Sequence, residues 1–324
     1  MVRRRFTNPC RPALPALCAL AALLALAPAA ALAASPGEGG SLDLMIGETG
    51  VAFGHAPRVN GVRVNFQDRY LERVNGVNLT LWSPAGRGNV GGEVNGLALG
   101  LAAPVAGRMH GVQAGLLAVV GNERLAGISV GGLAVVSEGE QAGFAFGGLA
   151  VVSEGRATGI GAGGLAYVSE GVMSGIHAAG LATVAEGGLD GIHMSGLATV
   201  AEGRMRGIGI AGLATVSEQG IDGLAVSGLA TATERMSGIG LSGLAVATQE
   251  ETRGIAIAGG VTGAGDLIGI AIAPYNRYEG LQRGLTIGVF NWASELRGVQ
   301  IGLLNRADNN PPPFRWLPVL NASF

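Results

Sequence analysis

Seven glutamates recur every sixteen residues through the middle of the chain and are its most regular set of potentially reactive groups. They are Glu138, Glu154, Glu170, Glu186, Glu202, Glu218 and Glu234. If successive repeats stack, these carboxylates line one edge about 5 Å apart, where like charges repel by roughly 1 kcal/mol even in water. The row predicts either oxygen ligands for Ca²⁺ or another hard cation, or a solvated edge partly balanced by arginines. Those arginines are Arg156, Arg204, Arg206 and Arg235.

Two histidines share the same spacing, since His177 and His193 occupy equivalent positions in adjacent repeats. Stacked imidazoles could hold a metal ion or respond to pH near neutrality. A pair supplies no third ligand, and His55 and His110 fall at other positions of the repeat. We therefore expect both histidines to be exposed and to recur by chance, without a shared function.

A third group is the polar stretch "NFQDRYLER", the densest cluster of charged side chains in the sequence. It contains Asp68, Arg69, Tyr70, Glu72 and Arg73. No serine–histidine–acid grouping or helical metalloprotease motif accompanies it. The stretch predicts a charged cap at the N-terminal end of the fold, and the sequence as a whole predicts neither an enzyme nor a bound organic cofactor.

The element that must position these groups is a short tandem repeat, in which each unit opens on a glycine. Sixteen opening glycines recur, mostly at intervals of 15 or 16 residues. They are Gly61, Gly76, Gly96, Gly111, Gly127, Gly143, Gly159, Gly175, Gly191, Gly207, Gly223, Gly238, Gly254, Gly269, Gly284 and Gly298. A fixed short period of this kind indicates units stacked in one dimension.

Within each unit the second and fourth positions are apolar, and the third is never a large hydrophobe. This alternation indicates a half-buried strand, and we expect its apolar positions, such as Ile208 and Ile255, to face the interior. A turn at a small pair such as Gly163-Gly164, where glycine tolerates positive φ, would point Ile160 and Leu165 to one interior. A large hydrophobe before each unit predicts another inner wall; these residues include Met173, Leu189, Met205, Ile221, Met236, Leu267 and Leu296.

The predicted fold is therefore an all-β solenoid of about sixteen coils, each of 14–16 residues. At the spacing of paired strands these coils would stack to roughly 75 Å. We assign residues 61–308 to the tandem β-repeat domain, 34–60 to an N-terminal lead-in or cap, and 309–324 to a C-terminal capping strand.

The alternative is an outer-membrane β-barrel of 16–18 strands, acting as a pore or an anchor. Alternating apolar residues lead to the terminal Phe324, and each repeat could supply one strand of about ten residues and a turn. Barrels place aromatic girdles at both membrane interfaces, yet between Gly96 and Ile272 the only aromatics are Phe144, Phe146 and Tyr167. The internal pattern favours the solenoid and leaves the barrel open.

The N-terminus predicts export. Arginines precede the apolar stretch "ALPALCALAALLALAPAA", and "ALA" at 31–33 offers small residues for cleavage, so residues 1–33 are interpreted as a signal peptide. Both cysteines, Cys10 and Cys18, lie within it. The remaining chain has 17 arginines, no lysine and 23 acidic residues. An acidic chain without a basic stripe is not expected to bind nucleic acid.

The last units, "GLTIGVFNWASELRGVQIGLLNRADNN", resemble bacterial surface-repeat proteins known from leptospires and others, which are built on tandem G-L-Q-I-G-L-x-N-x-A units. Gly284–Asn291 and Gly298–Asn305 match that form closely, whereas the central units depart from it. The resemblance implies a cell-envelope location and no assigned activity.

Together these patterns predict an exported, non-enzymatic repeat protein with a structural or surface-interaction role. We expect it at the outer membrane or cell surface of a Gram-negative-type bacterium, with envelope or surface components as partners. Membrane association is compatible with the sequence, and the oligomeric state is left open.

Overall fold

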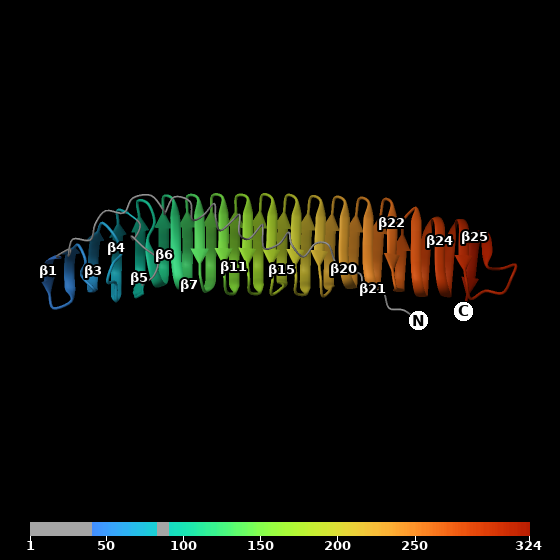
Figure 1. Ribbon diagram of the computed structural model, residues 1–324, viewed down its shortest axis with the longest axis horizontal. Coiled ribbons are helices and arrows are strands. Elements are labelled where there is room, and N and C mark those ends of the chain that lie inside the picture. Colours follow the sequence, from blue (N-terminus) through green and yellow to red (C-terminus); the bar gives the residue numbers. More distant parts are fainter. Residues whose placement is uncertain (1–40, 83–90) are drawn as a thin grey trace, which may run out of the picture. The chain divides into compact units, whose positions relative to one another are not determined.

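The computed structural model describes residues 41–82 and 91–324, and these residues form an all-β chain without a helix. Strands make up 74% of it, wound as a β-solenoid of about 14 turns (Figure 1). The predicted fold class is therefore confirmed. The chain divides into two compact units, Met1–Glu154 and Gly155–Phe324, each of which is described by itself.

Unit 1, Met1–Glu154, contains ten of the strands described. β1 pairs antiparallel with β2, and the strands from β2 onward pair in parallel, coil upon coil. The strands are β1 (Leu42–Ile46), β2 (Thr49–Phe53), β3 (Arg58–Asn65), β4 (Arg73–Thr80), β5 (Glu93–Gly100), β6 (Val105–Gly115), β7 (Ala118–Gly131), β8 (Ala134–Ser137), β9 (Glu140–Gly147) and β10 (Ala150–Ser153).

Unit 2, Gly155–Phe324, begins with coils that each supply one strand of seven residues and one of four. Towards its end the two strands of a coil merge into longer ones. The strands are β11 (Ala157–Gly163), β12 (Ala166–Ser169), β13 (Met173–Ala179), β14 (Ala182–Ala185), β15 (Leu189–Ser195), β16 (Ala198–Ala201), β17 (Met205–Ala211), β18 (Ala214–Ser217), β19 (Ile221–Ser227), β20 (Ala230–Ser242), β21 (Ala245–Ala258), β22 (Val261–Ala264), β23 (Asp266–Ile272), β24 (Tyr275–Ala307) and β25 (Trp316–Ser323).

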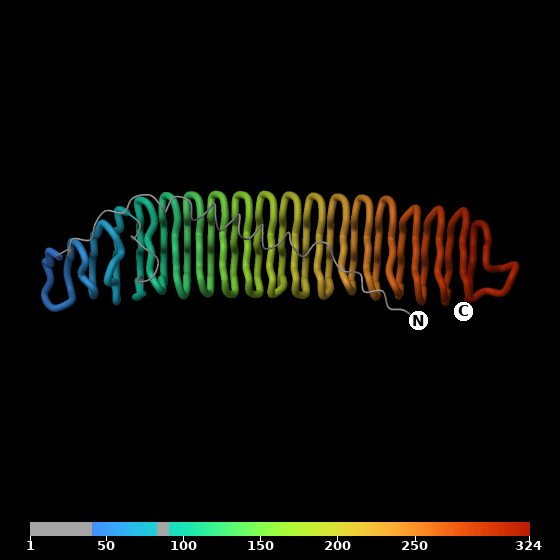
Figure 2. Tube along the Cα trace, viewed as in Figure 1, coloured from blue at the N-terminus to red at the C-terminus, as the bar shows by residue number. Residues whose placement is uncertain are grey.

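Successive coils stack in register, so that each residue lies beside its equivalent in the next repeat. Gly159 pairs with Gly175, and Gly175 with Gly191, through parallel strands. The Cα trace in Figure 2 shows this winding as a series of similar turns. Parallel pairing distinguishes the solenoid from the up-and-down barrel kept as the alternative, whose neighbouring strands would run antiparallel.

The opening glycines are required by the backbone of the stack. Gly175 has a φ of +121°, a conformation that residues with a side chain rarely adopt. A Cβ placed on Gly175 would lie 2.0 Å from the carbonyl oxygen of Gly159, and one on Gly191 would lie 2.2 Å from that of Gly175. Positive φ thus belongs to the opening glycine, and not to the small pair Gly163-Gly164 where the turn was expected to need it.

The predicted inward and outward sets of residues are reversed. The chain does bend after Gly163, but Ile160 and Leu165 both lie on the outer surface. Ile208 and Ile255 are only half-buried, whereas the third position, as at His177, is completely buried. The apolar residues of the alternating pattern therefore form the outside of the coil.

The reason for this reversal is a narrow interior. Met173, Leu189, Met205 and Ile221, which precede the opening glycines, are buried as predicted and fill most of the space. The remaining inward positions are mainly alanine, serine, threonine and glycine. At Gly209 even a Cβ would come within 2.6 Å of the sulfur of Met205, so a large third-position side chain has no room there.

The C-terminal coil is closed by a reversal of strand direction. β25 pairs antiparallel with β24, Gly298 facing Ser323 and Arg306 facing Trp316. Residues 311–313, three consecutive prolines, lie in the connection between these strands, where no ladder hydrogen bond is required of them.

Candidate functional site

The glutamate row lies where each coil turns from its short strand to the next long one. Glu170, Glu186, Glu202 and Glu218 each follow directly on a four-residue strand of unit 2, and Glu138 and Glu154 do so in unit 1. The backbone N–H of Glu186 donates to the carbonyl oxygen of Ser169, 3.0 Å away in the preceding coil. Coil stacking therefore fixes the row that the spacing predicted.

The electrostatics of this row are those of stacked like charges near solvent. Partial burial, together with the charges of Glu202 and Glu170, raises the pKa of Glu186 above its usual value. Arg204 pairs instead with Asp222, 3.1 Å away, and Arg235 with Glu250, 2.6 Å away. Arg204 therefore balances a carboxylate outside the row, whereas Arg235 interacts most strongly with Glu250 and also with the charge of Glu234.

Within residues 41–82 and 91–324, no group of three or more acidic, histidine or cysteine side chains is arranged to hold a metal ion. Calcium binding along the glutamate row stays a prediction. It would require the exposed carboxylates of successive coils to converge on one ion.

His177 and His193 are stacked, with ring centroids 5.4 Å apart and ring planes 4° from parallel. They are buried with 0% exposure, so the expectation that they are exposed is wrong. Tyr167 contacts His177 edge-on at 4.8 Å and occupies the space beside Gly161, where a Cβ would lie 2.1 Å from its ring.

The two imidazoles are held neutral. Burial lowers the pKa of His177 to about 3, helped by the neighbouring His193. Burial also lowers the pKa of His193 to about 4, although the backbone and charge of Asp190 oppose this shift. Among the described residues, none of the four ring nitrogens has a hydrogen bond of normal geometry. Apart from Asp190 beside His193, the described residues do little to offset the burial of these polar rings.

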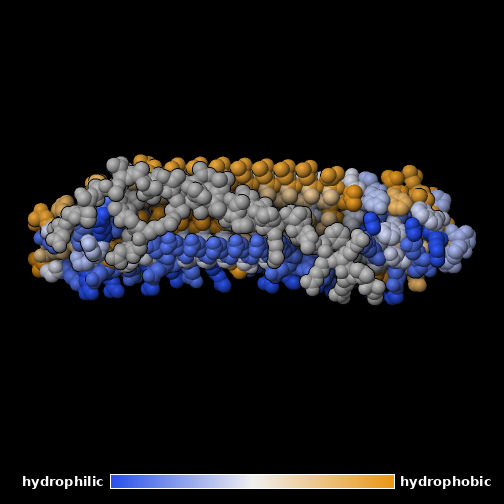
Figure 3. Space-filling view, viewed as in Figure 1, coloured by the Kyte–Doolittle hydropathy of each residue, from blue (hydrophilic) through white to orange (hydrophobic). Residues whose placement is uncertain are grey.

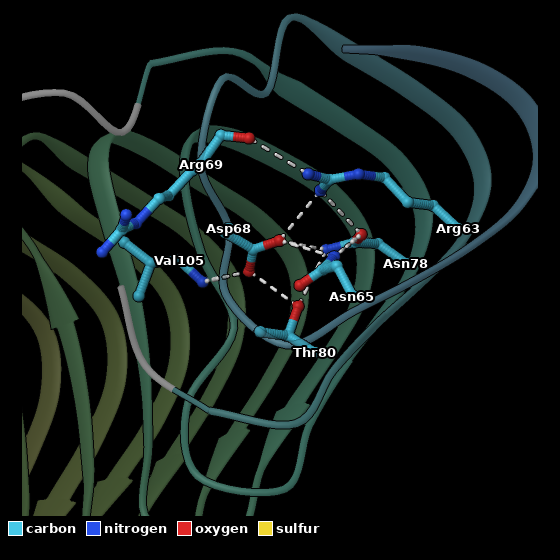
Figure 4. Close-up of polar contacts among 7 residues, drawn as sticks. All are labelled: Arg63, Asn65, Asp68, Arg69, Asn78, Thr80 and Val105. Carbon is cyan, nitrogen blue, oxygen red and sulfur yellow. Dashed lines mark hydrogen bonds and ion pairs between the residues drawn. The ribbon is translucent and has the colours of Figure 1, made fainter. Parts of the chain in front are cut away.

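The polar stretch near residue 68 folds inward and forms a buried ion pair in unit 1 (Figure 4). The Asp68 carboxylate and the Arg63 guanidinium are both 0% exposed, and their nearest atoms, Oδ1 and Nη1, are 3.0 Å apart. Burial lowers the pKa of Arg63, while the charge of Asp68 opposes that change. Five groups donate to Asp68: the side chains of Arg63, Asn65, Asn78 and Thr80, and the backbone N–H of Val105.

This network anchors the loop between β3 and β4 to the interior. Of the rest of the predicted cluster, Arg69 joins the network through its backbone carbonyl, which accepts from Arg63 Nη2 at 3.2 Å. The other three side chains do not join it: Tyr70 is exposed, Glu72 pairs with Arg58 at 2.6 Å, and Arg73 approaches Glu93 at 3.6 Å. Both carboxylate oxygens of Asp68 accept hydrogen bonds in the interior, and neither is exposed. Asp68 is the inward-facing centre of this cluster, and its role as a charged cap stays a prediction.

Sequence reasoning missed the feature that dominates the outside of unit 2, a row of exposed leucines at the bend between the long and short strands. This leucine ridge consists of Leu165, Leu181, Leu197, Leu213, Leu229 and Leu244, which are between 43% and 56% exposed. Figure 3 shows hydrophobic side chains along one edge of the coils and hydrophilic ones along the opposite edge. Leu165 was expected to face the interior; it and its equivalents instead lie on the outer surface.

A second missed feature is an alternating row of arginine and tryptophan on the last coils. The Arg277 guanidinium lies 4.9 Å from the centre of the Trp292 ring, and that of Arg306 lies 5.8 Å from it. Arg306 also stacks on Trp316 at 5.1 Å. Trp292 donates through Nε1 to Asp308, 3.1 Å away. These cation–π contacts are worth about 0.5–1 kcal/mol each at exposed sites, and they tie β25 to the last coil.

Comparisons with known proteins add no relative: no family model, no curated protein and no solved structure matches this chain. Among the described residues, no helix has the length and apolar character needed to cross a membrane.

Proposed function

We propose that this protein is an exported, non-enzymatic β-solenoid of the bacterial cell envelope, with a structural or surface-interaction role. The observation that carries the proposal is the outer surface of unit 2. There the leucine ridge and the isoleucines of the second and fourth positions form continuous apolar rows. Soluble monomers rarely leave apolar patches larger than a few hundred Å² uncovered, and larger ones usually mark interaction surfaces.

The repetitive form of this surface favours an extended binding surface over a localised catalytic site. Each coil repeats the side chains of its neighbour, as Ile176 does beside Ile192 and Leu197 does beside Leu181. Stacked repeats commonly provide extended binding surfaces. A reacting centre, in contrast, needs a local break in the repeat that brings unlike groups together.

Export is supported by the sequence of residues 1–33, which lie outside the described residues. The positive n-region, apolar stretch and small-residue site remain the basis for placing the chain beyond the inner membrane.

The resemblance to bacterial surface repeats gains a physical meaning from the last coils. Asn291 and Asn305, the asparagines of the matching motif, are both buried, and the Asn291 amide donates to Asn305 Oδ1 at 2.7 Å. The motif asparagine is thus a ladder residue that links one coil to the next. This supports membership of a stacked surface-repeat family for the C-terminal part of the chain.

The proposal is tested by expressing the full chain in a Gram-negative host, separating cytoplasm, periplasm and envelope, and determining the N-terminus of the protein by mass spectrometry. We expect a chain that begins after Ala33 and is recovered with the envelope fraction. An uncleaved chain that remains in the cytoplasm would contradict export and envelope location together.

A further inference from the structure

Seven successive coils of unit 2 contain an uncharged arc that runs over the long strand, round the bend and along the short strand. No Asp, Glu, Lys or Arg occurs in any of these arcs, although the turns between them are rich in charge. The arcs are residues 160–169, 176–185, 192–201, 208–217, 224–233, 239–248 and 255–264. Charge is therefore restricted to one edge of the coil stack.

Each arc is apolar on both sides of the leucine ridge. Ile176, on the long strand before the bend, is 43% exposed, and Leu181, at the bend, is 45% exposed. Beyond the bend, Ala182 is also partly exposed. The apolar surface thus wraps around a convex edge, whereas the opposite edge presents Glu186 and Arg204 to solvent.

The backbone N–H groups at the ridge form hydrogen bonds within the protein and do not depend on water. The N–H of Leu181 donates to the carbonyl oxygen of Leu165 at 2.8 Å, and that of Leu197 to Leu181 at 2.9 Å. The N–H of Ala182 also donates to Leu165, at 3.1 Å. An exposed turn could leave such groups to water, but in lipid each unsatisfied backbone group costs several kcal/mol. Coil-to-coil bonding removes that cost for the N–H and carbonyl groups of successive ridge leucines.

The shape of the surface decides between two occupants. A second copy of this chain could cover one flat face, but it would leave the ridge and the other face exposed. Fluid acyl chains can surround a convex edge on both sides. The five residue-to-residue steps from Ile176 to Leu181 span about 17 Å of extended chain, close to the roughly 15 Å of hydrocarbon in one leaflet.

We propose that the leucine ridge of unit 2 inserts edge-on into the acyl chains of one membrane leaflet, with the glutamate row remaining in water. The arrangement is the β-solenoid counterpart of an amphipathic helix lying in the membrane interface. This inference rests on the proposed envelope role and specifies its partner as a lipid surface.

The test uses the exported, processed protein and neutral phosphatidylcholine vesicles. An environment-sensitive fluorophore is attached to a single cysteine at Leu197→Cys, on the ridge, or at Glu202→Cys, on the charged edge. Addition of vesicles should shift the emission of the Leu197 probe to the blue, and nitroxide groups on the acyl chains should quench it. The Glu202 probe should change little.

A matched pair of variants measures the contribution of the ridge to binding. Leu181→Asn, Leu197→Asn and Leu213→Asn, combined, should weaken vesicle flotation at least about tenfold, because these side chains would otherwise enter the acyl region. Glu186→Gln, Glu202→Gln and Glu218→Gln, combined, should leave binding to neutral lipid unchanged. All six positions lie in turns on the outer surface, so both variants should fold.

The possible failures are separable. A Leu197 probe that stays in water on vesicles would overturn lipid insertion, even if the protein still fractionates with the envelope. A blue shift that appears without lipid and follows protein concentration would overturn it in favour of a second copy. A cytoplasmic, unprocessed chain would instead overturn the proposed function, whatever the probe reports.

Discussion

The last coils of unit 2 and the coils around His177 both bury polar side chains, but the buried asparagines of the last coils bond to one another whereas the buried histidines do not. Asn276 donates to Asn291 Oδ1 at 2.7 Å, and Asn291 donates to Asn305 Oδ1 at the same distance. His177 and His193 lie one coil apart in the same way, yet their four ring nitrogens have no normal hydrogen bond among the described residues.

The difference shows what a stacked interior requires of a polar residue. A carboxamide carries a donor and an acceptor, so each copy can bond to the copies above and below it. Imidazole rings stacked face to face direct their nitrogens sideways and cannot bond to one another. Asparagines stacked in register can therefore stabilise the fold through their hydrogen bonds. Histidines stacked in register destabilise it, because the desolvation of their rings is not offset by hydrogen bonds.

The largest effect is expected when the asparagine ladder is interrupted. Asn291→Ala removes the bonds to Asn276, Asn305 and the carbonyl of Ile301, and it leaves a small cavity. At about 1 kcal/mol for each lost bond we expect a loss of about 3 kcal/mol in the free energy of unfolding. Urea denaturation followed by circular dichroism measures it.

The control is an asparagine ladder on the surface. Asn75 bonds to Asn60 at 2.7 Å and to Asn95 at 3.0 Å, but it is exposed. Asn75→Ala should cost less than about 1 kcal/mol, because water replaces the lost bonds. Equal losses in the two variants would show that burial does not distinguish the ladders.

A smaller effect is expected from the histidine pair, and it depends on pH. Their folded-state pKa values of about 3 and about 4 lie below the unfolded value of 6.5, so the unfolded chain takes up protons first as pH falls. The free energy of unfolding is therefore unaffected by these histidines above pH 6.5, where both states hold them neutral, and it decreases as the pH falls towards 4. Between pH 6.5 and pH 5, each histidine should lower the free energy of unfolding by about 2 kcal/mol.

His193→Phe tests this assignment, since it keeps a ring in the stack and removes one titrating group. The decrease in the free energy of unfolding between pH 7 and pH 5 should become smaller by about 2 kcal/mol. Carboxylates are shared by both proteins and cancel in the comparison. An unchanged pH dependence would mean that His193 is not buried in the neutral form.

The smallest effect is expected in a column of buried threonines at equivalent positions of successive coils, Thr183, Thr199, Thr215 and Thr231. Thr215 is buried, and its hydroxyl donates to the carbonyl oxygen of Val226 over a long 3.4 Å. Thr215→Val keeps the shape of the side chain and should change the free energy of unfolding by about 0.5 kcal/mol. A loss above about 2 kcal/mol would place threonine with asparagine as a strong ladder residue.

The repeat period was enough to predict the coils, their register and the stacking of the glutamate row. A sixteen-residue spacing with identical side chains determines the register of neighbouring coils, because parallel stacking then places Glu186 beside Glu202. Which side of the strand faces inward was predicted wrongly. Alternation separates two sets of residues without saying which set is inside, and hydrophobicity favoured Ile176 over His177.

A signal for the correct side was present in the sequence. Met173 lies four residues before His177 in the same strand, so the two must face the same side. Placing Met173 in the interior, as its regular recurrence indicated, therefore also places His177 there. The bonds of Asp68 could not have been predicted from the repeat, because Asp68 lies in the loop between β3 and β4 and its partners lie on β3, β4 and β6.

The most direct test of the reversed interior is cysteine accessibility at two neighbouring residues of β17. Ile210 is 38% exposed and Ala211 is 3% exposed. In a Cys10→Ser, Cys18→Ser background and mild detergent, Ile210→Cys should react with a maleimide in the folded protein, whereas Ala211→Cys should react only after unfolding. Rapid labelling at 211 with protection at 210 would contradict the account, and would return the isoleucines to the core.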